Sequence, residues 1–274
     1  MTDTAPTTEP AITHHANGAA TYLPAIELAD VVKCFGSGTT EVRALDGISL
    51  RVEQRELVAI MGPSGCGKST LLHLAGAMEE PTAGRVRVFG HDLRGLDPTE
   101  RATLRRTQVG YVFQRLNLLP SLSAIENVTL PLELDGVGLR AARARARDAL
   151  AAVGLGGGDA LLLDRYPDDF SGGEQQRIAI ARAIVSSEEG DRRVLLADEP
   201  TGALDTVTAD GVIELLASLP ARFGTTVVLV THEPRFASWC DRVVFLRDGK
   251  VVDQTPSLLG TAPAAARVTT GGAS

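Results

Sequence analysis

The chain has 274 residues, a hydrophobic fraction of 44% and a formal net charge of −7. This length can bury a sizeable core, and the negative charge gives no bulk attraction to nucleic acid, so we expect no nucleic-acid partner. The three cysteines are far apart in the sequence, which favours a reducing compartment without structural disulfides. We see no apolar run of membrane-span length and no secretory signal pattern, so work at a membrane would require a partner to hold the chain there.

Both ends of the sequence have the composition of disordered tails. Residues 1–22 are rich in Thr, Ala and Pro without periodicity, and residues 256–274 are mostly Ala, Thr and Gly. His14-His15 suggests a metal ligand pair, but we favour two solvated tail residues. We therefore predict one domain over residues 23–255.

Short runs of alternating apolar residues open this domain. They cover residues 26–52, with breaks at 36–38 and at Asp46-Gly47, and return at residues 85–89 before a glycine. Alternation with a period of two is typical of half-buried strands. We predict antiparallel strands that flank the next unit of the chain.

The next unit is an apolar strand, a glycine-rich loop and a helix. Residues 57–61 are all apolar, and residues 70–75 read as a helix with an apolar face. This is the P-loop arrangement, in which loop N–H groups and a helix N-terminus bind phosphates. Lys68 would reach the β- and γ-phosphates, and the Ser69 hydroxyl would ligate Mg²⁺. A plain Gly-rich turn does not account for a lysine at the helix start. The expected nucleotide-binding residues here are Gly62, Pro63, Ser64, Gly65, Cys66, Gly67, Lys68, Ser69 and Thr70.

A helical region follows the strand that ends at Gln114. We predict a charged helix over residues 98–106 with Asp97 as its N-cap, then a buried strand over residues 109–113. A mostly helical stretch then occupies residues 115–184. Its most basic part holds four arginines, for which we favour an exposed helix face over an anionic-lipid or nucleic-acid contact. These arginines are Arg140, Arg143, Arg145 and Arg147.

The last third of the domain alternates strands and helices. Residues 194–197 and 226–230 read as strands with a helix between them over 209–219, which implies a parallel sheet with covered faces. A hairpin closes the domain across Asp248-Gly249. Asp198 and Glu199 follow the first of these strands, where one carboxylate can hold Mg²⁺ and the other can accept a proton from water. Two solvated surface acids would be unusual directly after so apolar a strand.

A second helix start offers another anion site. Ser171 is a good N-cap, and Gly172-Gly173 leave main-chain N–H groups open. At this point the chain resembles the ATP-binding subunits of ABC transporters. Residues 171–175 are similar to the signature motif of that family, whose usual form has leucine in place of Phe170 and often glutamine in place of Glu174.

The other family motifs follow in the family's order. Gln114 matches the Q-loop glutamine, residues 202–205 match the D-loop, and His232 matches the switch histidine that contacts the γ-phosphate. A lone histidine is more often structural, but its place within the ordered set favours the functional role. Phe35 stands where the family has an aromatic residue stacked on adenine, with core packing as the alternative.

The resemblance covers residues 26–252, and residues 113–132 are most similar to the branch of lipoprotein-releasing, macrolide-exporting and cell-division ATPases. Arg115-Leu116 departs from that branch beside the surface that would meet a permease. A soluble ABC ATPase of the cluster-assembly type, without a permease, is the alternative. A non-hydrolysing regulatory module is disfavoured by the presence of both Glu199 and His232.

The resemblance implies an α/β P-loop NTPase with a mainly parallel sheet core, an antiparallel β subdomain and a helical subdomain at about residues 115–184. It implies ATP and Mg²⁺ as cofactors, a homodimer that forms on ATP binding, and a membrane permease as partner. The protein would then be cytoplasmic, held peripherally at the inner face of the cell membrane. The implied residues are Glu199, His232, Gln114 and Lys68 for catalysis, Ser69, Gln114 and Asp198 for the metal, and Phe35, the P-loop, Ser171, Gly172, Gly173 and Glu174 for the nucleotide.

Overall fold

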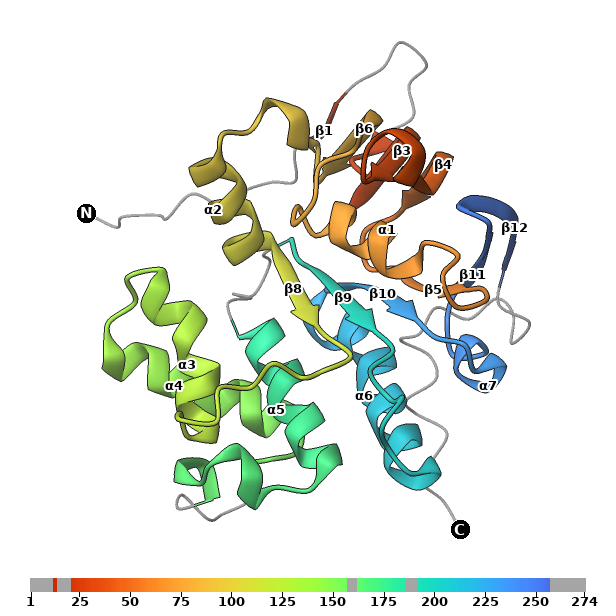
Figure 1. Cartoon of the computed structure of the whole chain (residues 1–274). Helices are drawn as coiled ribbons and strands as arrows, with labels where there is room; N and C mark the ends of the chain where they lie inside the picture. The colour runs from red at the N-terminus through yellow and green to blue at the C-terminus, as the bar shows by residue number, and fades with distance from the viewer. Residues whose placement is uncertain (1–11, 14–20, 157–161, 186–191, 257–274) are drawn as a thin grey trace.

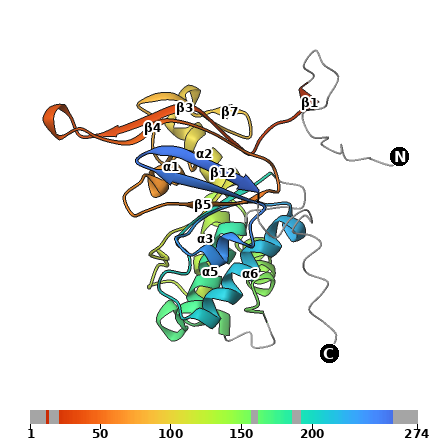
Figure 2. The same ribbon diagram turned by 90° about the vertical axis from the view of Figure 1, so that its right-hand side faces the viewer.

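The computed structural model describes residues 12–13, 21–156, 162–185 and 192–256. Figure 2 shows three layers, which are an antiparallel sheet, a second sheet and a group of helices. Helix α1 (Lys68–Ala75) lies between the two sheets (Figure 1). Within the described residues, no helix is both long and apolar enough to cross a bilayer.

The central sheet has six strands in the order β12-β11-β5-β10-β9-β8, all parallel except β12. The inner strand β5 shows that this sheet is covered on both faces. Leu57 and Ala59 join the apolar core on the face that carries the helices, whereas Val58 and Ile60 join the core shared with α1. A strand buried on both faces reads as a continuous apolar run, as predicted. The bounds are β5 Leu57–Met61, β8 Val109–Val112, β9 Val194–Asp198, β10 Thr226–Val230, β11 Arg242–Arg247 and β12 Lys250–Pro256.

The antiparallel sheet has the order β4-β3-β6-β7, which confirms the predicted subdomain. Its strands are β3 Ile26–Phe35, β4 Val42–Val52, β6 Ala83–Val88 and β7 His91–Asp92. The predicted break at Asp46-Gly47 is wrong, because β4 continues through both residues. Gly47 has a φ of 74°, and shifts in the β3–β4 register absorb the irregularity. A bulged strand therefore replaces the expected break.

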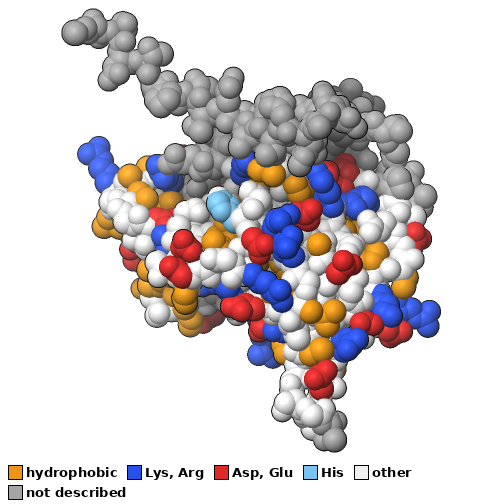
Figure 3. Space-filling model, turned by 90° about the horizontal axis from the view of Figure 1, so that it is seen from above, with side chains coloured by type: hydrophobic (Ala, Val, Ile, Leu, Met, Phe, Trp, Pro, Cys, Tyr) orange, Lys and Arg blue, Asp and Glu red, His pale blue; other side chains and the backbone are white. Residues whose placement is uncertain are grey.

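The outer face of this sheet carries charges of both signs. Figure 3 looks down on this side of the molecule and shows basic and acidic side chains intermixed. Two ion pairs account for part of this pattern: Arg87 bonds Glu27 at 3.0 Å, and Arg85 lies 3.2 Å from Asp92.

The predicted helical subdomain contains α3 (Ala124–Leu134), α4 (Leu139–Ala152) and α5 (Gly172–Ile184). Residues 115–123 precede it without regular structure, and α3 starts at a capping box in which Ser123 and Glu126 bond each other's main chain. Along α4, Arg140 and Arg147 are exposed as expected, but Arg143 and Arg145 are half-buried.

Helices α2 (Pro98–Gln108), α6 (Thr206–Phe223) and α7 (Pro234–Ala237) lie outside the helical subdomain. Asp97 caps α2, as predicted, with Glu100 closing a capping box. Helix α6 covers the central sheet beside α5, and the short α7 precedes β11 (Figure 1).

The disorder of the two tails stays a prediction. Most of residues 1–22, including His14-His15, and all of residues 257–274 lie outside the described residues. Within the N-terminal segment, β1 (Ile12–Thr13) pairs with β2 (Thr21–Tyr22) in an antiparallel arrangement.

Candidate active site

The loop between β5 and α1 has a shape that only glycine permits at two positions. Gly62 has a φ of 153°, and a Cβ there would lie 2.1 Å from the carbonyl oxygen of Leu246. Gly67 has a φ of 104°, and a Cβ there would lie 2.5 Å from the carbonyl oxygen of Ala44. Both neighbours are main chain and cannot swing aside. The loop is therefore packed directly against β11 and β4 at these two glycines.

Lys68 is the first residue of α1 and is buried, with 7% of its surface exposed. Its Nζ donates to the carbonyl oxygens of Gly62 and Pro63, each at 2.9 Å. An ammonium has three donors, so one remains for an incoming oxygen. The positive charge sits at a helix N-terminus inside the loop, where both the dipole and the lysine favour a bound phosphate.

Asp198 ends β9 next to the start of α1. Burial and the neighbouring Glu199 raise the pKa of this carboxyl, while the hydroxyl of Ser69, bonded to Asp198, and the nearby His73 and Lys68 act in the opposite direction. A hydroxyl and a carboxylate already in contact are oxygen ligands of the kind that Mg²⁺ prefers, and phosphate oxygens would complete such a site. Asp198 and Ser69 therefore fit the expected metal.

Glu199 lies between two other predicted catalytic residues. The Gln114 Nε2 donates to Glu199 Oε2 at 3.4 Å, and His232 Nδ1 lies 3.6 Å from Glu199 Oε1. Glu199 itself has a φ of 45°, a left-handed conformation that costs a side chain about 1–2 kcal/mol. Gln114, Glu199 and His232 are thus gathered at the carboxyl ends of β8, β9 and β10, beside the P-loop. This group can hold a water molecule and accept its proton.

The predicted signature residues form a second group at the start of α5. Ser171 caps the helix: Glu174 N donates to Ser171 Oγ at 3.4 Å, and the hydroxyl of Ser171 donates to Glu174 Oε2 at 2.7 Å. This pairing lowers the pKa of the Glu174 carboxyl. Phe170, the residue at which the signature departs from its usual form, is buried in the apolar core.

The D-loop packs against these signature residues within the same chain. Asp205 caps α6 through Val207 N and Thr208 N, both at 3.1 Å. A Cβ on Gly173 would lie 2.2 Å from Thr208 Cγ2, whereas one on Gly172 would lie 3.4 Å from Leu204 Cδ2. In Figures 1 and 2, α5 lies in the helical layer and α1 lies on the other side of the central sheet. The structure therefore separates the signature from the P-loop of its own chain.

Phe35 ends β3 with 41% of its surface exposed, so part of its ring is accessible to solvent. Lys33 Nζ lies 4.9 Å from the centre of this ring. No sequence pattern signals the contacts that hold the P-loop from outside, such as the bond from Gly249 N to the Cys66 carbonyl oxygen at 3.1 Å. This contact uses the main chain of the turn between β11 and β12, which is distant from the P-loop in the sequence.

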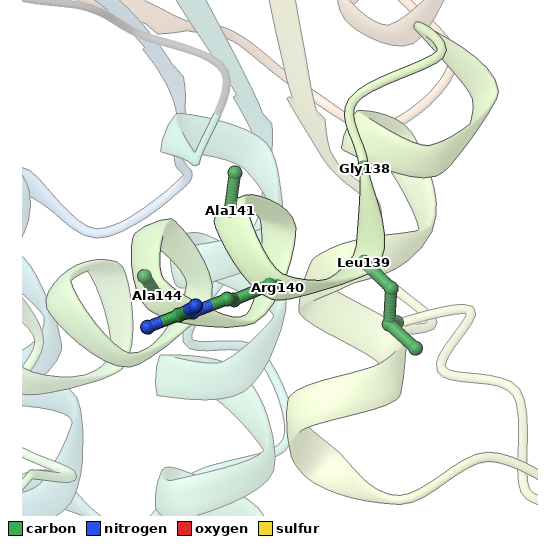
Figure 4. Close-up of a pocket in the computed structure, with 5 residues that line it drawn as sticks. All are labelled: Gly138, Leu139, Arg140, Ala141 and Ala144. Carbon is green, nitrogen blue, oxygen red and sulfur yellow. The ribbon is translucent and has the colours of Figure 1, made fainter.

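An open pocket on the outside of α4 is not part of this site. Five residues at the start of α4 line it, and apart from Arg140 the side chains drawn in Figure 4 are apolar. It contains no carboxylate, histidine or hydroxyl group for catalysis. The lining residues are Gly138, Leu139, Arg140, Ala141 and Ala144.

Comparison with known proteins agrees with this geometry. Residues 45–202 match the family model described as ABC transporter. The chain is 47% identical to the lipoprotein-releasing system ATP-binding protein LolD of Geobacter metallireducens, over 83% of this chain and 97% of that protein. It is also 47% identical to the macrolide export ATP-binding/permease protein MacB of Hyphomonas neptunium, over 85% of this chain but only 35% of that longer protein.

A solved structure supports the same relationship. The dimeric ATP-binding cassette MJ0796, bound to ADP and Pi in a post-hydrolysis state, superposes with a TM-score of 0.75 at 38% identity, covering 84% of this chain and 98% of that one. The match to the family model, the relatives and the arrangement of the site all lead to one conclusion: the chain belongs to the ABC transporter family, as one of its ATP-hydrolysing cassettes.

Proposed function

We propose that this cassette binds and hydrolyses MgATP to drive conformational change in a membrane permease of the lipoprotein-releasing or macrolide-exporting kind. The observation that supports hydrolysis most strongly is the Glu199 carboxylate between Gln114 at 3.4 Å and His232 at 3.6 Å, beside the P-loop lysine. The permease follows from the names of the relatives, and it would hold the protein at the cytoplasmic face of the membrane.

In this proposal the P-loop amides and Lys68 stabilise negative charge on the phosphates, and Phe35 stacks on the adenine. Ser69 and Asp198, with Gln114, would hold Mg²⁺, which would neutralise negative charge on the phosphates. Glu199 orients water and accepts its proton, while His232 lies on the γ-phosphate side.

A composite site between two copies explains why the signature lies away from the P-loop of its own chain. Ser171, Gly172, Gly173 and Glu174 of one copy would close over the nucleotide held by the P-loop of the other. ATP would then stabilise the closed dimer, and hydrolysis would release it, because only the closed state contacts the γ-phosphate from both sides.

Mixing two inactive variants tests the composite site. Lys68→Ala removes the P-loop charge, and Gly172→Asp places a carboxylate in the signature with only an ordinary contact to Leu204. Gly173→Asp is a poor choice, because its Cβ would collide with Thr208 of the same chain. The uncharged Gly172→Asn is the control for shape.

If the signature acts across the dimer, the mixed dimer contains one site free of both defects, and mixing should restore ATPase activity. If the signature acts within one chain, every site of the mixed dimer carries one defect. Activity that stays at background in verified mixed dimers, and also in a tandem fusion with one intact site, would contradict the composite site.

Binding to a membrane permease would distinguish this proposed function from that of a soluble cassette of the cluster-assembly type. Tagged Glu199→Gln protein with ATP, added to membranes, should co-purify with an integral membrane protein that detergent solubilises. Recovery of the tagged protein only in the soluble fraction, with soluble partners, would favour the alternative.

A further inference from the structure

Arg182 of α5 is bonded to the segment that follows the Q-loop glutamine. Its Nη1 donates to the carbonyl oxygen of Asn117 at 2.6 Å, and its Nη2 donates to that of Leu116 at 2.7 Å. Burial lowers the pKa of this guanidinium, and no carboxylate of the described residues forms an ion pair with it. A half-buried cation is therefore balanced by two successive main-chain carbonyl groups.

These carbonyl groups belong to an irregular segment of the chain, which does not fix its own conformation. Asn117 has a φ of 49°, and residues 115–123 have no helix or strand hydrogen bonds of their own. A left-handed residue in an irregular segment persists only when its surroundings fix it. The two bonds from Arg182 supply that constraint three residues after Gln114.

The later half of the segment is fixed in the same way to α3. The side chain of the fully buried Asn127 accepts a hydrogen bond from Leu119 N at 2.8 Å. Its Nδ2 lies within donating distance of three carbonyl oxygens, those of Leu119 (3.0 Å), Leu122 (3.0 Å) and Ser123 (3.1 Å). The segment after Gln114 is thus bonded to the helical subdomain, whereas the Gln114 side chain contacts Glu199 at the central sheet.

Arg182 lies on the helix that begins with the signature. Gly172 and Arg182 are ten residues apart on α5, which is about 15 Å along a continuous helix. A helix moves as a unit, so a displacement at its N-terminus reaches the carbonyl groups that Arg182 holds.

We propose that Arg182 is a positioning residue that couples the signature helix to Gln114, and through Gln114 to the catalytic Glu199. The proposal rests on the proposed function, since the process that it serves is ATP hydrolysis. Arg182 touches neither nucleotide nor metal in this account. Arg182 fixes the position of Gln114 relative to α5, so Gln114 moves when α5 moves.

A double-mutant cycle with Gln114→Ala tests this coupling. Arg182→Met keeps most of the side-chain volume but loses both bonds, and Arg182→Lys keeps the cation and one possible bond. Arg177→Met is the matched control, because Arg177 also lies on α5 and donates to a carbonyl oxygen, that of Val153 at 2.8 Å, far from the Q-loop.

Arg182→Met should lower kcat by about tenfold to a hundredfold with little change in ATP affinity, because the P-loop is untouched and only the positioning of Gln114 is lost. Arg182→Lys should lie between this variant and the wild type. In the Gln114→Ala background, Arg182→Met should change kcat by less than about twofold, since residues that act through one another are not additive. Arg177→Met should give the same factor in both backgrounds.

Hydrogen exchange provides a readout that does not need hydrolysis. In folded Arg182→Met, amides 114–119 should exchange on the order of tenfold faster than in the wild type, with Arg182→Lys between the two, and Arg177→Met should leave these amides unchanged. Equal factors for Arg182→Met in both backgrounds, or unchanged exchange at 114–119, would overturn the coupling. Absence of ATPase activity in the wild-type protein would instead overturn the proposed function. The exchange rates at 114–119 would still show whether Arg182 holds this segment.

Discussion

Two P-loop glycines that look equivalent in the sequence should respond very differently to alanine. At Gly65 a Cβ meets nothing within 4 Å, so Gly65→Ala carries only the cost of a φ of 76°, about 1–2 kcal/mol. At Gly62 a Cβ would lie 2.1 Å from the Leu246 carbonyl oxygen, and it needs at least about 3.0 Å.

The missing distance, 3.0 − 2.1, is about 0.9 Å, and it must come from main chain. Leu246 lies in β11, which pairs with β5 on one side and β12 on the other, so that strand resists movement. We expect Gly62→Ala to cost at least about 3 kcal/mol, in the range of severe overpacking with backbone strain.

Thermal unfolding without nucleotide measures both costs. At about 2–4 °C per kcal/mol for a domain of this size, Gly65→Ala should lower Tm by only a few degrees, and Gly62→Ala should lower it by at least about 6 °C. Equal shifts for the two variants, or a larger shift for Gly65→Ala, would refute the packing of this loop against β11.

Two further predictions concern the proposed Mg²⁺ ligand Asp198 and an exposed leucine after the Q-loop. The raised pKa of Asp198 means that the native state binds this proton more tightly than the unfolded chain does. The stability of the protein without Mg²⁺ should therefore fall as pH rises from the ordinary to the raised pKa of this carboxyl. In a thermal-unfolding pH series, Asp198→Asn should abolish this pH dependence. A less stable Asp198→Asn at neutral pH would contradict this. Leu119 has 42% of its surface exposed, whereas Leu118 packs against the core. Leu119→Glu should therefore weaken membrane recruitment in a flotation assay while leaving the basal ATPase rate within about twofold. Leu118→Glu should instead destabilise the fold, because it buries a charge. Unchanged recruitment in Leu119→Glu would argue against a partner at this surface.

The features that could be predicted from the sequence are those encoded by local pattern. The run of residues 57–61 has no polar member, because β5 is buried on both faces, and the glycines and Lys68 that follow show the nature of the loop directly. Asp198 and Glu199 are identified in the same way by the apolar strand before them. Parallel strands then bring these groups together at one edge of the sheet.

The remaining features depend on contacts between distant segments. Asp46-Gly47 indicated a break between strands, but pairing with β3 keeps the strand continuous through both residues, since tertiary contacts override local preference. Nothing in the sequence around Arg182 shows that its guanidinium reaches the carbonyl groups of Leu116 and Asn117. The collision that a Gly173 side chain would have with Thr208 likewise exists only because α5 and α6 are packed together.

The most direct test of the account is the hydrolysis rate of Glu199→Gln beside its ATP affinity. Glutamine keeps the shape and the contact with Gln114 but cannot accept a proton from water. We predict that kcat falls by at least about 10²-fold, the usual effect of losing a general base, that ATP still binds, and that an ATP-bound dimer accumulates on size exclusion. Near-normal turnover in Glu199→Gln would contradict the assignment of this carboxylate as the group that activates water.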